Sequence, residues 1–175
     1  MATRRKFIKN TVVISAGVAL YGCGKGEQAG IFTKSERDCL IAMAEQFIPR
    51  DEFAGATDAG VINYIENWAG KYYPEILPLY KESLASMQKA SQKLHSKDFQ
   101  SLDFKTQTEF LKLMEAGKLA GWGGQKGFFD EILERTMQGF YGSPRHGGNK
   151  NNLSFKMLKL DMPLVIGQNR YGRVS

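Results

Sequence analysis

Few side chains in this sequence have the types and spacing that enzyme chemistry requires. The two histidines, His95 and His146, have no second ligand at a metal-binding spacing. His95 ends a polar helical segment, which is typical of a solvated helix terminus. His146 lies in a glycine-rich loop, where we expect it to contact another protein rather than to act as a catalytic base. Neither histidine indicates a metal centre.

The remaining reactive groups also favour structural roles. Cys39 lies beside Leu40 and Met43 in an apolar pattern, which predicts a buried, inert thiol rather than a nucleophile. Asp51 and Glu52 are adjacent carboxylates, but one such pair supplies too few oxygens for Ca²⁺. We therefore expect their loop to cap the following helix and to form local ion pairs.

Cofactor-binding motifs are not evident either. The glycines at positions 22, 24 and 26 follow no strand and open no βαβ unit, so they do not predict a dinucleotide site. The sequence has no phosphate loop, haem-attachment motif, flavin fingerprint or Ser/His/Asp arrangement. We expect no catalytic residue, no metal site and no cofactor on this chain.

An export signal opens the chain. Residues 3–9 (TRRKFIK) match the twin-arginine pattern through Arg4, Arg5 and Phe7. An apolar stretch follows over residues 11–20, and as a helix it would be about 15 Å long, half the ~30 Å hydrocarbon core of a bilayer. It is therefore a signal region rather than a membrane anchor. The twin-arginine route carries proteins that are already folded, typically with a cofactor or partner in place.

Residues 20–23 (LYGC) resemble the lipobox at which bacterial lipoproteins are acylated on cysteine and cleaved before it. This predicts a signal peptide over residues 1–22, a lipid on Cys23, a tether over 23–31 and a single domain over 32–175. The alternative is an ordinary cleavage site beside a chance cysteine. In either case we expect a periplasmic protein, and acylation would attach it to the membrane.

Five helices are predicted in the domain, with no segment that alternates like a strand. The first helix begins at a Thr33/Glu36 capping box and ends at Pro49. Asp58 is predicted to cap the second helix, and Pro74 or Pro78 begins the third. The fourth covers about residues 105–118 and the fifth about 126–138. The fold class is therefore all-α. The predicted apolar faces include Trp68 in the second helix, Leu94 in the third, Leu113 and Met114 in the fourth, and Phe128, Leu133 and Met137 in the fifth.

From residue 140 onward the pattern changes to an irregular tail rich in glycine and aromatic residues. Such a segment in a compact protein is either disordered or ordered against something else, and its aromatic and Arg content favours the second. The predicted partner contacts are Phe140, Tyr141, Arg145, His146 and Asn149. The alternative for Phe140 and Tyr141 is that they close the helical core.

The charge of the chain does not indicate nucleic-acid binding. The formal net charge is +6, but the leader holds Arg4, Arg5, Lys6 and Lys9 with no acid beside them. The mature domain is nearly balanced, and it has no basic run interleaved with aromatic residues.

The domain resembles a known family. Residues 47–52 (FIPRDE), 55–56 and 59–65 (AGVINYI) are similar to the first half of the small, gamma subunit of membrane-bound gluconate 2-dehydrogenase. Residues 128–129, 136, 139–141, 144 and 147–149 are similar to its second half. The resemblance covers roughly residues 33–150, and the order and spacing of these motifs carry it.

This resemblance implies a non-catalytic small subunit of a periplasmic sugar dehydrogenase of the gluconate, glucose or glucoside 3-dehydrogenase type. In such complexes a large subunit of the glucose-methanol-choline oxidoreductase type carries FAD and oxidises the sugar, and electrons leave through a cytochrome with haem c. The small subunit is expected to help the flavoprotein to fold, assemble and cross the membrane. The alternative is a free-standing periplasmic lipoprotein that binds a small ligand or another partner.

Overall fold

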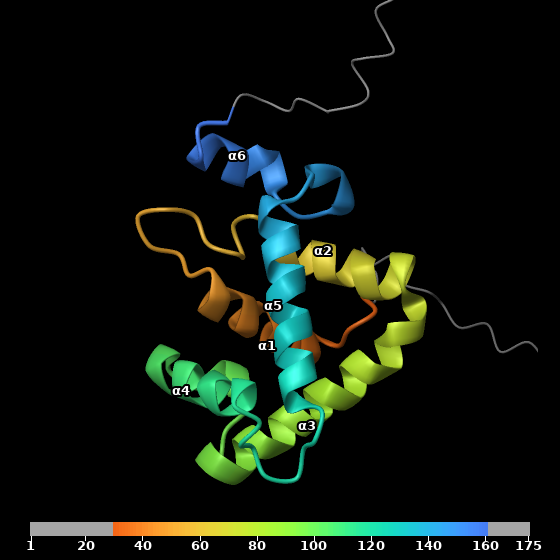
Figure 1. Cartoon of the computed structure of the whole chain (residues 1–175), viewed down its shortest axis with the longest axis vertical. Coiled ribbons are helices and arrows are strands. Elements are labelled where there is room, and N and C mark those ends of the chain that lie inside the picture. The colour runs from red at the N-terminus through yellow and green to blue at the C-terminus, as the bar shows by residue number, and fades with distance from the viewer. Residues whose placement is uncertain (1–29, 161–175) are drawn as a thin grey trace, which may run out of the picture.

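The computed structural model describes residues 30–160, and in this range the chain forms six α-helices joined by short 3₁₀ and π segments, with no strand. The all-α prediction is confirmed. Helix α5 (Gln125–Tyr141) stands at the centre and contacts α1, α2, α3, α4 and α6 (Figure 1). Arg4, Arg5, Phe7 and Cys23 lie outside the described residues, so the export and lipidation predictions stay predictions.

Helix α1 (Lys34–Phe47) begins as the sequence predicts. The Thr33 side chain accepts from the Glu36 backbone N–H, and the Glu36 carboxylate accepts from the Thr33 N–H at 2.8 Å. These reciprocal bonds satisfy two donors at the helix start, an arrangement worth about 1 kcal/mol. The buried face of α1, which includes Leu40 and Met43, enters the core.

Helix α2 (Val61–Asn67) corrects one prediction. Its N-cap is Gly60, whose positive φ of 69° suits glycine, and no side chain caps it. Asp58 instead accepts from the Gly55 N–H at 3.0 Å and pairs with Arg50 at 3.3 Å. The predicted local ion pairing of this loop is therefore present, but the predicted side-chain cap is wrong. The side chain of Asp58 folds back to close its own loop.

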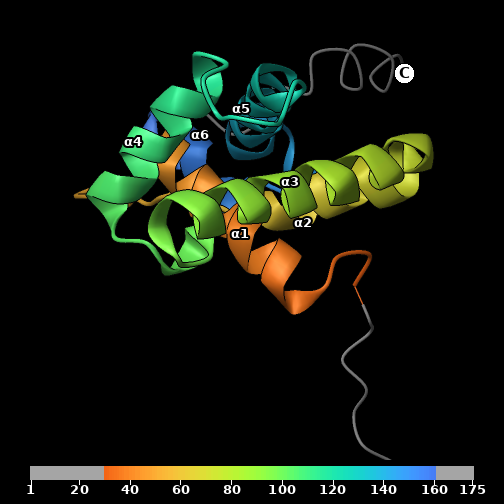
Figure 2. The same cartoon turned by 90° about the horizontal axis from the view of Figure 1, so that it is seen from below.

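After α2 the chain continues through a π-helical turn (Trp68–Tyr72) and a 3₁₀ turn (Pro74–Ile76) into α3 (Leu77–His95), which crosses the width of the molecule (Figure 2). A 3₁₀ turn (Phe99–Ser101) then leads to α4 (Phe104–Glu115). Two predictions of buried positions are wrong here. Leu94 and Leu113 are exposed, and Leu111 is buried on α4 instead. Leu94 lies in the last turn of α3, at the edge of the packed region.

Helix α5 is longer than predicted because Gly139 does not end it. A Cβ at Gly139 would lie 3.0 Å from Cβ of Tyr64, so the glycine allows α2 to approach α5 closely. The helix continues through Phe140 to Tyr141. On the same helix Phe128 and Ile132 are buried, whereas Met137 is exposed, contrary to prediction.

The segment after α5 is ordered in short turns rather than irregular. It contains 3₁₀ turns at Pro144–His146 and Lys150–Asn152, followed by α6 (Leu153–Met157) beside the C-terminal end of α5 (Figure 1). A Cβ at Gly148 would lie 2.1 Å from the carbonyl oxygen of Gly139, so two glycines meet where this segment crosses α5. Within residues 30–160 no helix has the length and apolar character needed to cross a bilayer.

Candidate partner-binding site

An aromatic hollow of about 450 Å³ lies between the turn that follows α2 and the loop that follows α5. We call it the histidine hollow, and its lining residues are Tyr64, Trp68, Tyr72, Tyr73 and His146. Tyr72 and Tyr73 are 40% and 43% exposed. Exposed aromatic rings gathered in one place are typical of a surface that binds a partner.

The rings come together because of their spacing along the helix. Tyr64, Trp68 and Tyr72 recur every four residues and therefore follow one face. The rings of Tyr64 and Trp68 are stacked with centroids 6.3 Å apart, and Tyr73 packs on Trp68 at 4.2 Å. The packed row therefore consists of Tyr64, Trp68 and Tyr73, whereas the ring of Tyr72 lies against His146 at 5.8 Å.

His146 closes the hollow from the opposite side. The side-chain amide of Asn67 donates to the backbone carbonyl of His146 at 3.0 Å, which fixes the loop on α2. Nε of Arg145 donates to Nε2 of the His146 ring at 3.0 Å, and Tyr72 Oη lies 3.3 Å from Nδ1. A neutral imidazole that accepts at Nε2 carries its proton on Nδ1, so Nδ1 donates to Tyr72. The ring of His146 is therefore held between an arginine and a tyrosine.

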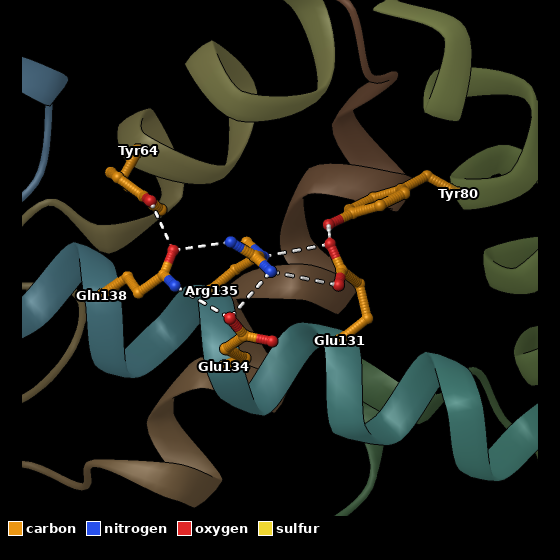
Figure 3. Close-up of polar contacts among 6 residues, drawn as sticks. All are labelled: Tyr64, Tyr80, Glu131, Glu134, Arg135 and Gln138. Carbon is orange, nitrogen blue, oxygen red and sulfur yellow. Dashed lines mark hydrogen bonds and ion pairs between the residues drawn. The ribbon is translucent and has the colours of Figure 1, made fainter. Parts of the chain in front are cut away.

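Beneath the hollow, Arg135 of α5 forms the centre of a polar cluster (Figure 3). Its Nε donates to Glu131 at 3.0 Å, its Nη1 donates to Gln138 at 2.6 Å, and its Nη2 pairs with Glu134 at 3.0 Å. The guanidinium carbon lies 3.9 Å from the centroid of the Trp68 ring, which adds a cation–π contact. Arg135 is only 7% exposed, and most of its N–H donors have acceptors within the cluster, as a buried charge requires.

Two tyrosines connect this cluster to other helices. Tyr64 of α2 donates to Gln138 at 2.7 Å, and Tyr80 of α3 donates to Glu131 at 2.9 Å (Figure 3). Burial raises the pKa of both phenols, and the charge of Glu131 adds to the rise for Tyr80. Burial alone would lower the pKa of Arg135, but the neighbouring Glu131 and Glu134 carboxylates raise it overall. Since the phenols stay neutral and the arginine stays charged near neutral pH, the cluster is suited to structural support rather than proton transfer.

The structure separates the predicted contact residues into two groups. Tyr141 and Arg145 are exposed and His146 is partly exposed, so they remain predicted partner contacts. Phe140 is fully buried, which agrees with the alternative that it closes the helical core. Asn149 is also fully buried; it donates to the Gly142 carbonyl at 2.8 Å and accepts from the Ser154 N–H at 2.9 Å. The burial of Phe140 and Asn149 favours structural roles for both.

Sequence reasoning missed Tyr72, Tyr73 and Arg135 as members of this region. The available signal is the recurrence of aromatic residues at positions 64, 68 and 72, of which the predicted apolar face of the second helix includes only Trp68. Arg135 gave no signal because a charged residue between apolar positions of a helix is ordinarily placed on its solvated face. Its acceptors lie on its own helix, but the Trp68 ring that covers its guanidinium comes from another segment of the chain.

The other reactive groups are accounted for within the fold. Cys39 is buried, as predicted, and burial raises the pKa of its thiol, so the thiol stays protonated. Asp51 accepts from the Phe53 N–H at 2.8 Å inside its own loop. His95 lies at the exposed end of α3, with its ring 6.3 Å from that of Phe110. Among the described residues no three His, Cys, Asp or Glu side chains are grouped as metal ligands.

Comparison with known proteins gives one match. The family model described as gluconate 2-dehydrogenase subunit 3 matches residues 34–161, which is nearly the whole helical domain. Searches of curated proteins and of solved structures found no match.

Proposed function

The chain belongs to the gluconate 2-dehydrogenase subunit 3 family, and we propose that it is the non-catalytic small subunit of a periplasmic, FAD-dependent sugar dehydrogenase complex. A subunit of such a complex must have a surface that binds another subunit. The observation that carries the proposal is the exposed aromatic histidine hollow, together with Arg145 at its edge. Tyr and Arg are among the residues that most often dominate the binding energy of protein interfaces.

The internal chemistry of the domain agrees with an accessory role. The best-connected polar groups, centred on Arg135, bond to one another and join α2, α3 and α5. In this arrangement Glu131 accepts from both Tyr80 and Arg135. Catalysis requires a group that is free to exchange protons or electrons with a substrate, and this cluster is engaged in holding helices together.

The catalytic partner in this proposal is a flavoprotein of the glucose-methanol-choline oxidoreductase type, which supplies FAD. A cytochrome with haem c would accept its electrons. The leader residues Arg4, Arg5 and Phe7 would export the assembled pair through the twin-arginine route, and acylation of Cys23 would attach it to the membrane. The small subunit would therefore act in folding, export and assembly.

Purification under native conditions tests the proposal. We expect the chain to co-purify with a flavin-containing protein that shows sugar dehydrogenase activity with an artificial acceptor. Recovery of the chain as a stable monomer, with no flavoprotein attached, would instead favour a free-standing lipoprotein.

A matched pair of charge reversals tests the surface. Arg145→Glu places a negative charge at the edge of the histidine hollow, and we expect it to weaken the complex by about tenfold or more. Lys89→Glu changes the charge equally on the exposed face of α3 and serves as the control. Equal affinity of the partner for both variants would count against this surface as the interface.

A further inference from the structure

A second and larger cavity adjoins the histidine hollow, and its walls differ from those of the hollow. It has a volume of about 770 Å³ and lies between the first turns of α3, the loop before α5 and the first turns of α5. We call it the tryptophan cleft, because both tryptophans of the chain line it. Its ring-bearing residues are Trp68, Tyr73, Tyr80, Trp122 and Phe128. A cavity of this size fits a small organic ligand.

The tryptophan cleft has both hydrogen-bond acceptors and donors among its polar lining residues. The carboxylates of Glu82 and Glu131 line it together with the hydroxyls of two serines, and none of the described lining residues is Lys, Arg or His. Glu82 is exposed, so its carboxylate is accessible to a ligand. Nε1 of Trp68 is a buried donor without a partner, a situation that costs about 1–3 kcal/mol.

Glycines keep one wall of the tryptophan cleft bare. A Cβ added at Gly123 or Gly127 would have no atom within 4 Å, so neither glycine is required by packing inside the chain. Neither has a positive φ, so backbone conformation does not require them either. Gly127 lies in the first turn of α5, where glycine costs up to about 1 kcal/mol relative to alanine. The two glycines leave this wall of the cleft open to a ligand.

We propose that the tryptophan cleft binds a neutral sugar, a monosaccharide or disaccharide, on this subunit itself. The faces of a sugar ring carry C–H groups that pack against aromatic rings, and its edge carries hydroxyls that donate to carboxylates. Glu131 is already paired with Arg135, but Glu82 is an exposed carboxylate at the cleft and the described lining residues include no Lys, Arg or His, so a phosphate or an acid of the same size is disfavoured. The bare glycine wall gives a flat ring close access to the backbone. This inference concerns the isolated chain and does not depend on the identity of its protein partner.

Intrinsic fluorescence provides a direct test, because the two tryptophans of the chain both line the cleft. The full chain is titrated with glucose, with sucrose and, as an anion of similar size, with gluconate. We expect a saturable change with a neutral sugar and a weaker response, or none, with gluconate. No saturable change with either neutral sugar, or an equal response to gluconate, would overturn the proposal.

Two adjacent substitutions separate the cleft from the rest of the helix. Gly127→Leu fills the bare wall and should weaken sugar binding by about tenfold or more, while the melting temperature stays equal or rises. Lys126→Leu changes an exposed neighbour whose ion pair with Asp130 lies at the surface, and it should bind sugar as the wild type does. Glu82→Gln removes the accessible carboxylate without changing shape and should also weaken binding.

The variants distinguish a sugar from a protein occupant. If Gly127→Leu leaves sugar binding unchanged, the sugar does not occupy the tryptophan cleft. If the fluorescence changes only when the catalytic subunit is added, the cleft belongs to the subunit interface and the sugar proposal fails, while the proposed accessory function stands.

Discussion

The buried arginine beneath the histidine hollow gives the most informative stability prediction. Arg135→Met removes the charge but retains an apolar stem against Trp68. Hydrogen bonds to charged groups contribute about 1.5–3 kcal/mol each when buried. The carboxylates of Glu131 and Glu134 are 30% and 57% exposed, so water replaces part of what the guanidinium supplies. We therefore expect the free energy of unfolding to fall by about 2–4 kcal/mol.

Thermal and urea denaturation, followed by circular dichroism and by tryptophan fluorescence, measure this change. A loss of that size lowers the melting temperature of a domain of this length by about 5–15 °C. Arg135→Lys should also destabilise, because an ammonium cannot reproduce the fork of donors that reaches three side chains.

The surface pair Lys126–Asp130 is the matched control on the same helix. Lys126→Ala breaks a contact of 2.7 Å between exposed groups and should cost less than about 0.5 kcal/mol. If Arg135→Met costs no more than this control, the polar cluster does not hold α2 and α3 to α5 as we have argued.

Other predictions concern single contacts. Gly139→Ala should destabilise the fold by about 1–3 kcal/mol, because its Cβ would press on Tyr64. Gly127→Ala in the same helix should stabilise it by about 0.5–1 kcal/mol, because no atom lies near the added Cβ. Denaturation midpoints that move in the same direction would refute the distinction between a packed and an unpacked glycine. Asn149→Ala should cost about 1–3 kcal/mol and speed hydrogen exchange in α6, since it removes two hydrogen bonds that join Gly142, at the C-cap of α5, to Ser154 of α6. Unchanged exchange would contradict this role. Hydrogen bonds from the Thr106 hydroxyl and N–H lower the pKa of Asp103 in the folded chain. The ionised cap therefore stabilises the fold above the unfolded pKa, and this stabilisation is lost as the pH falls through the lower folded pKa. Asp103→Asn should differ from the wild type in melting temperature at pH 7 and should have the same melting temperature in acid.

Local sequence signals predicted the helical framework well. The Thr33 capping box and the buried positions of α1 around Cys39, Leu40 and Met43 depend on neighbours a few residues away. Such features can be inferred without knowing the tertiary structure. The errors at Leu94 and Met137 arise because periodicity identifies a face of a helix but not how far the neighbouring helices extend along it.

The candidate site was less accessible to sequence reasoning. Gly139 resembles a helix stop, and only its contact with Tyr64, 75 positions earlier in the chain, shows that it is a packing position. Arg135 bonds to Glu131, Glu134 and Gln138 of its own helix, but Tyr64 of α2 and Tyr80 of α3 join the cluster through Gln138 and Glu131. The π-helical turn at Trp68–Tyr72, which aligns the aromatic row, has no signature that we recognised. Non-local contacts of this kind appear only in the folded chain.

The central claim is that this chain accompanies a flavoprotein to the periplasm, and one measurement tests it most directly. The catalytic subunit is expressed with and without the full chain, and flavin-dependent sugar oxidation is measured in the periplasmic fraction. We expect activity there only when the two are expressed together, and its loss when Arg4 and Arg5 are both replaced by lysine. Equal periplasmic activity of the flavoprotein in the absence of this chain would contradict the account.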